Sequence, residues 1–308
     1  MKLNIAVEQC IALKASLGFR FHSERVILTA FCKAMGKVTL SQVKPQAVRT
    51  YLDGKGPVTR HWHRKWEVLR SFYRFAVARG WAHRSPLPAH APKVEISFRA
   101  HIYTKQELHR LLQAITPKVS GSLSPQTVRT ILLLLYGAGL RISEALNLQL
   151  PDVDLETSVL CIRRSKFFKT RLVPLGPKLT EALRAYQAQG PGPSGPNAYF
   201  FRADNDTPVS RSAMERVFAK LRLAADVKRT DGGRFQPRLH DLRHTAVVHR
   251  LIAWYREGVD VQSRLIQLST YLGHADIAAT QKYLTWTPEL RKEASARFAR
   301  YAFGGSNE

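Results

Sequence analysis

A proline-rich stretch about one third of the way along the chain limits how the fold can be organised. Between His83 and Lys93 the sequence contains three prolines, at positions 86, 88 and 92. Proline lacks an amide donor and pushes the residue before it out of the helical region, so no continuous helix passes through this stretch. The chain has 308 residues, which suits two domains of about 150 residues each. We therefore predict a first domain at 1–82, an extended linker at 83–100 and a second domain at 101–290.

The first domain is predicted to be all helical. Ser23 is placed to cap a helix that runs to about Gly36, and Pro45 lies in the first turn of another that ends at Gly54. A later helix, over 60–79, shows apolar residues at spacings of three and four, which is the pattern of one buried stripe. The stripe consists of Trp62, Trp66, Leu69, Tyr73 and Ala76.

The same helix carries many positive charges, and Glu67 alone offsets them. A charged helix face is usually just solvated, but charges of one sign on a face favour contact with nucleic acid. We therefore predict that this helix binds DNA. Its predicted DNA-binding residues are Arg60, Arg64, Lys65, Arg70 and Arg74.

Composition points to the same partner. The chain has 48 Lys and Arg against 23 Asp and Glu, for a net charge of +25, and such a field attracts a polyanion through release of its counterions. A generally cationic protein without a nucleic-acid partner is the alternative. Three cysteines without paired spacing indicate a reducing interior. With no signal-peptide pattern and no apolar run near the ~20 residues of a membrane span, we expect a cytoplasmic, nucleoid-associated protein without membrane contact.

The second domain is predicted to be mostly helical with a small β-sheet, so the chain as a whole is mainly α. Ser124 and Pro125 are start signals for an apolar helix over 128–136, which should lie at the centre of the core. A glycine-rich turn, 137–140, ends that helix, and a new helix begins at Arg141. Two β-prone runs, 158–163 and 171–174, flank a basic tip and predict a hairpin.

Two arginines are candidates for holding a phosphate. Arg141 follows the glycine-rich turn at a helix N-terminus, which is a natural anion site, although a lone arginine more often forms a surface ion pair. Arg243 lies three residues after His240, so both residues share one helical face. The planar guanidinium fork suits two oxygens of one phosphate.

Several histidines accompany these arginines. His240 and His274 are the favoured candidates for relaying a proton or donating to a phosphate oxygen near neutral pH. His244 and His249 are further candidates that sequence spacing does not separate from ordinary packing residues. His240 ranks above them because Arg243 shares its face.

The predicted hairpin tip carries two lysines. Lys166 is placed to reach into a groove and protonate a leaving 5′ oxygen, and Lys169 is its rival. A metal-dependent nuclease would need clustered carboxylates. Near these motifs the chain has only Glu144, Asp241 and Asp276, which are scattered. We therefore expect no metal site.

A tyrosine near the C-terminus is the candidate nucleophile. Tyr283 lies nine positions after His274 and directly after Lys282. It is either a core residue or the group that attacks a phosphate, and the cations upstream favour the second role. Tyr271, which precedes the histidine, ranks below it.

Taken in order, these motifs resemble the tyrosine recombinases of the phage integrase family. The N-terminal helical domain is similar to the family's core-binding domain in size and position only. The matching blocks, which lie between about 101 and 290, are Gly137-Ala138-Gly139-Leu140-Arg141-Ile142-Ser143-Glu144, Lys166 with Arg171-Leu172-Val173-Pro174-Leu175, His240-Asp241-Leu242-Arg243-His244-Thr245, Leu272-Gly273-His274 and Thr280-Gln281-Lys282-Tyr283.

The resemblance implies an α+β catalytic domain, a tail at 291–308 and cleavage of DNA without metal, cofactor or ATP. Tyr283 would form a 3′-phosphotyrosyl link, Arg141 and Arg243 would stabilise the phosphorane, and His274 would hydrogen-bond the phosphate. His240 would act as base and Lys166 as general acid. The family usually has glycines beside that lysine, which this chain lacks, so Lys169 remains a rival. Lys169 and Arg171 join the predicted DNA contacts.

The resemblance also implies partners. Such enzymes act on double-stranded DNA with specific sites, as homo-tetramers that pass through a Holliday junction and exchange C-terminal segments. The basic stretch Pro288–Phe303 would make that exchange here, with accessory recombinases as further partners. We predict a site-specific recombinase, integrase or transposase of a mobile element. A type IB topoisomerase-like relaxer and a non-catalytic DNA-binding partner are the alternatives, although the latter should have lost one of Arg141, Arg243 or Tyr283.

Overall fold

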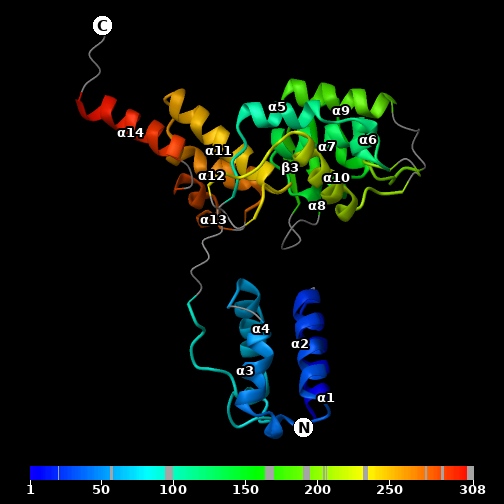
Figure 1. The fold of residues 1–308 in the computed structure, drawn as a ribbon, viewed down its shortest axis with the longest axis vertical. Helices are drawn as coiled ribbons and strands as arrows, with labels where there is room; N and C mark the ends of the chain where they lie inside the picture. Colours follow the sequence, from blue (N-terminus) through cyan, green and yellow to red (C-terminus); the bar gives the residue numbers. More distant parts are fainter. Residues whose placement is uncertain are drawn as a thin grey trace. The chain divides into compact units, whose positions relative to one another are not determined.

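The computed structural model describes the chain apart from residues 20, 56–57, 94–99, 164–169, 190–194, 204, 206, 232–234, 275, 286–287 and 304–308. The chain divides into two compact units, Met1–Phe98 (unit 1) and Arg99–Glu308 (unit 2). Both are drawn in Figure 1. The predicted fold class, mainly helical with a small sheet in the second part of the chain, is confirmed.

The regular elements in the described part of unit 1 are helices joined by loops. Its elements are α1 (Leu3–Ser16), α2 (His22–Met35), η1 (Leu40–Gln42), α3 (Pro45–Asp53) and α4 (Arg60–Ala78). The predicted cap at Ser23 is wrong, because α2 begins at His22 and follows Phe21, whose φ is 42°. Phe21 packs against the core of the unit, so a tertiary contact and not a polar cap sets the start of this helix.

The predicted apolar stripe of α4 forms much of the core of unit 1. Leu69 and Tyr73 are fully buried, and the Tyr73 ring meets Phe31 of α2 edge-on with ring centroids 6.3 Å apart. Trp62 is also buried, and its indole Nε1 donates to Asp53 Oδ1 at 2.8 Å. Trp66 is half-buried beside them. The stripe therefore fixes which face of α4 is left for solvent and for the charged residues.

The proline-rich segment 83–93 lies against unit 1. Trp66 Nε1 of α4 donates to the carbonyl of Pro88 at 3.1 Å, and His63 Nε2 lies 2.7 Å from the carbonyl oxygen of Pro92. Leu87 and Ala91 pack against the core. The segment contains no helix, and two of its carbonyls contact side chains of α4. The domain limits predicted from the sequence stay predictions.

Within its described residues, unit 2 contains one small antiparallel sheet of three strands in the order β1-β2-β3. The strands are β1 (Val153–Asp154), β2 (Val159–Ile162) and β3 (Arg171–Pro174), and Ile162 pairs with Arg171 where the hairpin opens toward its tip. The predicted pair of strands is confirmed. The tip itself, with Lys166 and Lys169, lies outside the described residues.

The rest of the described part of unit 2 is mostly helical. Its helices are α5 (Lys105–Gln113), α6 (Pro117–Ser120), α7 (Pro125–Gly137), α8 (Ile142–Leu146), η2 (Leu150–Asp152), α9 (Pro177–Gln189), α10 (Arg211–Ala224), α11 (Asp241–Arg256), α12 (Val261–Leu272), α13 (Ala278–Gln281), η4 (Lys282–Thr285) and α14 (Pro288–Phe303).

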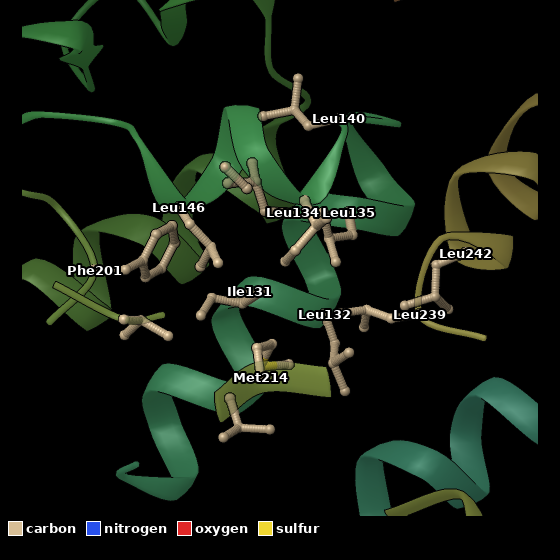
Figure 2. Packing of buried hydrophobic residues seen from close by; sticks show 14 of the residues in the cluster. Ile131, Leu132, Leu134, Leu135, Leu140, Leu146, Phe201, Met214, Leu239 and Leu242 are labelled. Carbon is tan, nitrogen blue, oxygen red and sulfur yellow. The ribbon is translucent and has the colours of Figure 1, made fainter. Parts of the chain in front are cut away.

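The apolar helix α7 is central to unit 2, as predicted. Ser124 caps it by accepting from the amide of Thr127 at 3.0 Å. Ile131 and Leu134 are fully buried, and Figure 2 shows their side chains among those of Leu146, Phe201 and Met214. Removal of these large apolar groups from water supplies the main driving force for packing. The helix thereby becomes a fixed base for the turn that follows it.

That turn presents Arg141. Helix α7 ends at Gly137, Gly139 has a φ of +60°, and Arg141 is the N-cap of α8. A positive φ suits glycine, which has no Cβ to clash. A Cβ at Gly139 would also come within 3.2 Å of Leu272 Cδ2 at the end of α12. The glycine therefore lets the turn after α7 pack closely on the turn after α12.

The C-terminal helices form a second core around Tyr283. Val247 and Leu251 of α11, Leu265 of α12 and Leu290 of α14 are buried together with it. Helix α14 packs against α11 (Figure 1), where Arg256 Nε donates to Glu293 Oε1 at 2.8 Å. The first part of the predicted tail therefore contacts its own chain. No helix within the described residues is both long and apolar enough to span a membrane.

Candidate active site

Glu144, on the first turn of α8, holds two arginines. Arg141 Nη1 donates to Glu144 Oε1 at 2.7 Å, and the Arg141 amide donates to Oε2 at 3.0 Å. Arg171, from β3, donates to both carboxylate oxygens, at 3.1 and 2.8 Å. Such charge-assisted, bidentate bonds are strong and fix the planes of both groups. Glu144 thus orients two cations that are far apart in the sequence.

Arg243 lies at the centre of the group and is only 2% exposed. Its Nη1 donates to the carbonyl of Gly139 at 2.5 Å and its Nη2 to that of Leu272 at 2.7 Å. Its guanidinium is also 3.9 Å from Glu144. Three guanidinium groups around one carboxylate leave net positive charge, which is what a bound phosphate requires.

His274 connects these arginines to the tyrosine. It follows Gly273, which ends α12 in the left-handed region with a φ of +66°. His274 Nε2 lies 3.1 Å from Arg243 Nη2, and Nδ1 lies 2.7 Å from Thr280 Oγ1. Its ring is stacked on that of Tyr283, with centroids 6.3 Å apart and planes 6° apart. The motif therefore places an imidazole between Arg243 and Tyr283.

Gly273 also makes room for Arg171. A Cβ at this position would lie 2.7 Å from Arg171 Nη1, so any side chain here would require the Arg171 guanidinium to shift. The neighbouring carbonyls are used as well, since Arg171 Nε donates to Tyr271 at 2.9 Å and Arg141 Nη2 donates to Gly273 at 3.2 Å. The turn after α12 is thus held by the same arginines that surround Glu144.

Tyr283 lies in η4 and is 3% exposed. Its hydroxyl is 3.0 Å from His244 Nδ1, and the two rings are 5.5 Å apart. The His240 ring in turn meets the His244 ring edge-on at 4.9 Å. Sequence reasoning ranked His240 first and left His244 open. The contact between His244 and Tyr283 depends on where η4 packs against α11, and residue spacing alone carries no signal for it.

The surroundings of the site lower the pKa of both Glu144 and His274, with different results for their charge near neutral pH. Burial raises the pKa of Glu144, but hydrogen bonds and charge from Arg171 and Arg141 outweigh this effect and lower the pKa to about 2. Burial and the positive charge of Arg243 lower the pKa of His274 to about 4. Near neutral pH the carboxylate is therefore charged and the imidazole is neutral, able to accept or donate a proton.

Tyr283 is held as a neutral phenol in this environment. Burial raises its pKa, while the positive charges of Arg243 and Arg141 lower it in part. Burial, and then the charge of Arg141, lower the pKa of Arg243 to about 10, which still leaves it charged at neutral pH. An attacking phenol must therefore give up its proton to a neighbouring group during the reaction.

Two rivals named from the sequence are engaged elsewhere. The Tyr271 hydroxyl lies 3.4 Å from the carbonyl of Pro174, and His249 Nδ1 lies 2.9 Å from the hydroxyl of Tyr136. The contacts of Arg171 are internal too, because its side chain is 9% exposed and binds Glu144. In this structure Arg171 is engaged with Glu144, and its predicted contact with DNA stays a prediction.

The predicted DNA-binding residues of α4 are of two kinds. Arg60, Arg70 and Arg74 are exposed, and Arg70 stacks on the Trp66 ring at 5.0 Å. Arg64 pairs with Glu24. Lys65 is half-buried and donates to the carbonyls of Tyr51 and Leu52 at the end of α3, at 2.7 and 3.3 Å. Lys65 therefore serves the packing of unit 1, whereas the exposed arginines are available to a ligand.

The acidic residues of the site are committed to these cations. Asp241 is 1% exposed and accepts from Arg238 Nη2 at 2.9 Å. Among the residues that the structure describes, no three His, Cys, Asp or Glu side chains gather in a way that would hold a metal ion.

The chain is similar to known proteins. Residues 102–289 match the profile of the Phage integrase family. The chain is 31% identical over 304 residues to a Sinorhizobium fredii protein with the provisional name integrase/recombinase y4rB, covering 96% of each chain. It is also 31% identical over 231 residues to tyrosine recombinase XerA of Thermococcus kodakarensis, covering 75% of this chain and 72% of the relative.

A solved structure shares the fold. A lambda integrase tetramer bound to a Holliday junction superposes with a TM-score of 0.69 at 17% identity, over 92% of this chain and 77% of that one. The chain belongs to the phage integrase family and is a tyrosine-type site-specific DNA recombinase.

Proposed function

We propose that this enzyme cuts and rejoins DNA at specific sites through a 3′-phosphotyrosyl intermediate on Tyr283, and that it needs neither metal nor ATP. One observation carries the proposal. The Tyr283 ring is stacked on His274, whose Nε2 lies 3.1 Å from the guanidinium of Arg243. A phosphate bound by that guanidinium is therefore adjacent to the phenol. Positioning and electrostatic stabilisation are the main contributions an active site makes to phosphoryl transfer.

In the proposed reaction, Tyr283 is the nucleophile. The Tyr283 oxygen attacks the scissile phosphorus, and the bond from phosphorus to the 5′ oxygen breaks. Arg141 and Arg243 stabilise the negative charge that develops on the non-bridging oxygens, and His274 hydrogen-bonds the phosphate. We propose Lys166 as the acid that protonates the leaving 5′ oxygen, with Lys169 as its rival. A 5′-hydroxyl from another duplex then reverses the reaction, because the phosphotyrosyl bond retains the energy of the phosphodiester.

The proposed assembly is a homo-tetramer on two duplexes that passes through a Holliday junction. The lambda integrase tetramer on such a junction, which shares the fold, supports this arrangement, as does the net charge of +25. Exchange of the C-terminal segment would replace the contacts of Leu290 and Glu293 with α11 of the same chain by equivalent contacts in a neighbour. We propose a role in a mobile element, in the cytoplasm and at the nucleoid, with accessory recombinases as further partners.

The test uses a suicide duplex taken from the ends of the element that carries the gene, after gel shift has verified that the enzyme binds it. A nick near the cleavage position lets the short 5′-hydroxyl strand diffuse away and traps the covalent adduct. We expect wild type to give a protein–DNA adduct on a denaturing gel, stable to chelator and formed without ATP. Tyr283→Phe should give none, because the nucleophilic oxygen is absent.

Tyr271→Phe is the matched control, since it keeps the main-chain carbonyl that Arg171 uses, and it should form adduct like wild type. An adduct from Tyr283→Phe, or none from wild type on a bound site, would contradict the proposal. Relaxed circles without junctions or exchanged strands would point instead to a topoisomerase-like relaxer.

A further inference from the structure

The contact between α11 and η4 singles out one imidazole. His244 Nδ1 lies 3.0 Å from the Tyr283 hydroxyl, which is within the range in which a general base acts. His244 is half-buried and Tyr283 is buried, so packing holds the pair in one geometry. The hydroxyl of the proposed nucleophile, Tyr283, therefore already contacts a ring nitrogen of His244.

His240 has a different position. It precedes α11 as its N-cap, and within the described residues its ring contact is with His244, at 4.9 Å and nearly perpendicular. Residues four apart on a helix lie one above the other, so His240 covers the His244 ring. This packing restricts the His244 ring to the orientation that meets Tyr283.

The charge around His244 keeps it neutral before DNA binds. Burial lowers the pKa of His244 to about 3, and the positive charges of Arg238 and Arg243 act in the same direction. A neutral imidazole has a lone pair to offer a phenol. A bound phosphodiester adds negative charge beside Arg243, which offsets those cations and makes the imidazole more basic. Substrate binding itself therefore prepares His244 to take a proton.

We propose that His244, and not His240, is the catalytic base for Tyr283, an inference that rests on the proposed function. As the bond between the Tyr283 oxygen and phosphorus forms, the phenolic O–H bond breaks and its proton moves to His244 Nδ1. The bond from phosphorus to the 5′ oxygen breaks, and the proposed lysine acid protonates that oxygen. In rejoining, a 5′-hydroxyl attacks phosphorus and gives its proton back to the lysine, the bond from phosphorus to the Tyr283 oxygen breaks, and His244 returns its proton to the departing phenolate. His240 is then a positioning residue.

Two substitutions separate a base from an anchor. The side-chain amide of His244→Asn can accept a hydrogen bond near the position of Nδ1 but does not take up a proton at neutral pH, whereas His244→Ala removes both abilities. We expect both variants to bind the duplex like wild type. Both should form adduct on the suicide duplex at least about 100-fold more slowly, within the usual range for a lost general base.

His249→Asn is the matched control. His249 is on the same helix and has a similar contact, with Nδ1 2.9 Å from the hydroxyl of Tyr136, but it lies outside the site. This variant should react like wild type and unfold at a temperature close to those of the His244 variants. The comparison removes a general effect of losing an imidazole from α11.

A second substrate identifies the proton transfer. A duplex with a 5′-bridging sulfur releases a thiolate, which needs no acid. We expect it to restore adduct formation to a variant of the acid, Lys166→Ala or Lys169→Ala, and to leave the His244→Asn defect unchanged. Sulfur rescue of His244→Asn would overturn the assignment, because His244 would then serve the leaving group.

The remaining outcomes are also decisive. Adduct formation at the wild-type rate in His244→Asn would overturn the base role. This holds whatever the rate of His244→Ala, and also if His244→Ala fails to fold. Absence of adduct from wild type itself is a different failure, because it contradicts the function proposed for Tyr283 and not the choice of base. Slow reaction of His244→Asn on both substrates supports the inference.

Discussion

Helix α4 and the surroundings of Glu144 both concentrate positive charge, and they use it differently. On α4, Arg70 and Arg74 are exposed, and solvent and salt screen their charges. Around Glu144, the side chains of Arg141, Arg171 and Arg243 are 26%, 9% and 2% exposed. The first arrangement suits attraction of a long polyanion, while the second suits a fixed position for one phosphate. The burial of an arginine therefore decides which role its charge serves.

The largest expected effect comes from removing the shared carboxylate. Glu144→Gln keeps the shape of the side chain but leaves the guanidinium groups of Arg141 and Arg171 without a buried negative partner. We expect unit 2 to lose about 3 kcal/mol of stability, since breaking a buried ion pair costs roughly this much. Adduct formation should fall by roughly 100-fold, because the displaced arginines no longer meet the phosphate. Denaturant unfolding and the suicide duplex measure the two effects.

The exposed Glu156 provides the control, and Glu156→Gln should change neither quantity. The effect of Glu144→Gln should also depend on pH. The pKa of Glu144 is lowered when folded, so its stabilising charge is fully present above the ordinary carboxyl pKa of about 4.3. That contribution is lost as pH falls through about 2. A stability difference that persists unchanged at pH 2 would show that the negative charge of Glu144 is not what holds the cluster.

Lys65 is the intermediate case, because it lies on α4 but is used internally. Lys65→Met removes two hydrogen bonds to the carbonyls at the end of α3. We expect unit 1 to lose about 1 kcal/mol of stability, while the slope of log affinity for DNA against log salt concentration stays the same. Lys55→Met, at an exposed position after α3, should leave stability unchanged. A smaller slope of log affinity against log salt concentration for Lys65→Met would indicate that Lys65 contacts DNA.

The smallest effect is expected at an exposed arginine. Arg74→Gln should leave stability within about 0.5 kcal/mol of wild type, lower the affinity for duplex DNA a few-fold, and reduce the salt slope by about 1, as for one lost phosphate contact. Arg25→Gln, at an exposed position on α2, is the matched control. An unchanged slope in Arg74→Gln, measured by gel shift at several salt concentrations, would remove α4 from the proposed DNA interface.

Some of the fold was predictable because local sequence controls it. Ser124 and Pro125 start α7, and a glycine-rich turn ends it, so the helix and the place of Arg141 after it follow from neighbouring residues. The same holds for the strands of the hairpin. The start of α2 was missed because Phe21 packs against residues distant in sequence.

The site was less predictable, since its contacts join distant segments. Glu144 is three residues after Arg141, and a glutamate at this helical position signals a bond to the N-cap amide. Nothing in the sequence indicates that Arg171 and Arg243 approach the same carboxylate. Likewise, His240 and His244 are equivalent by composition. Only the packing of η4 against α11 gives one of them the contact with Tyr283.

The arginines of the site also donate hydrogen bonds to main-chain carbonyl oxygens, which every residue has. Arg243 donates to the carbonyls of Gly139 and Leu272, and Arg141 donates to that of Gly273. A saturation library at these three positions changes side chains and leaves each acceptor in place, so it measures the tolerance for bulk and, at the two glycines, for a side chain at positive φ. Protein semisynthesis can change the backbone itself. An ester in place of the amide after Leu272 would make the Leu272 carbonyl a weaker hydrogen-bond acceptor. The acceptor strength of these main-chain carbonyls can therefore be changed by chemical synthesis but not by mutation.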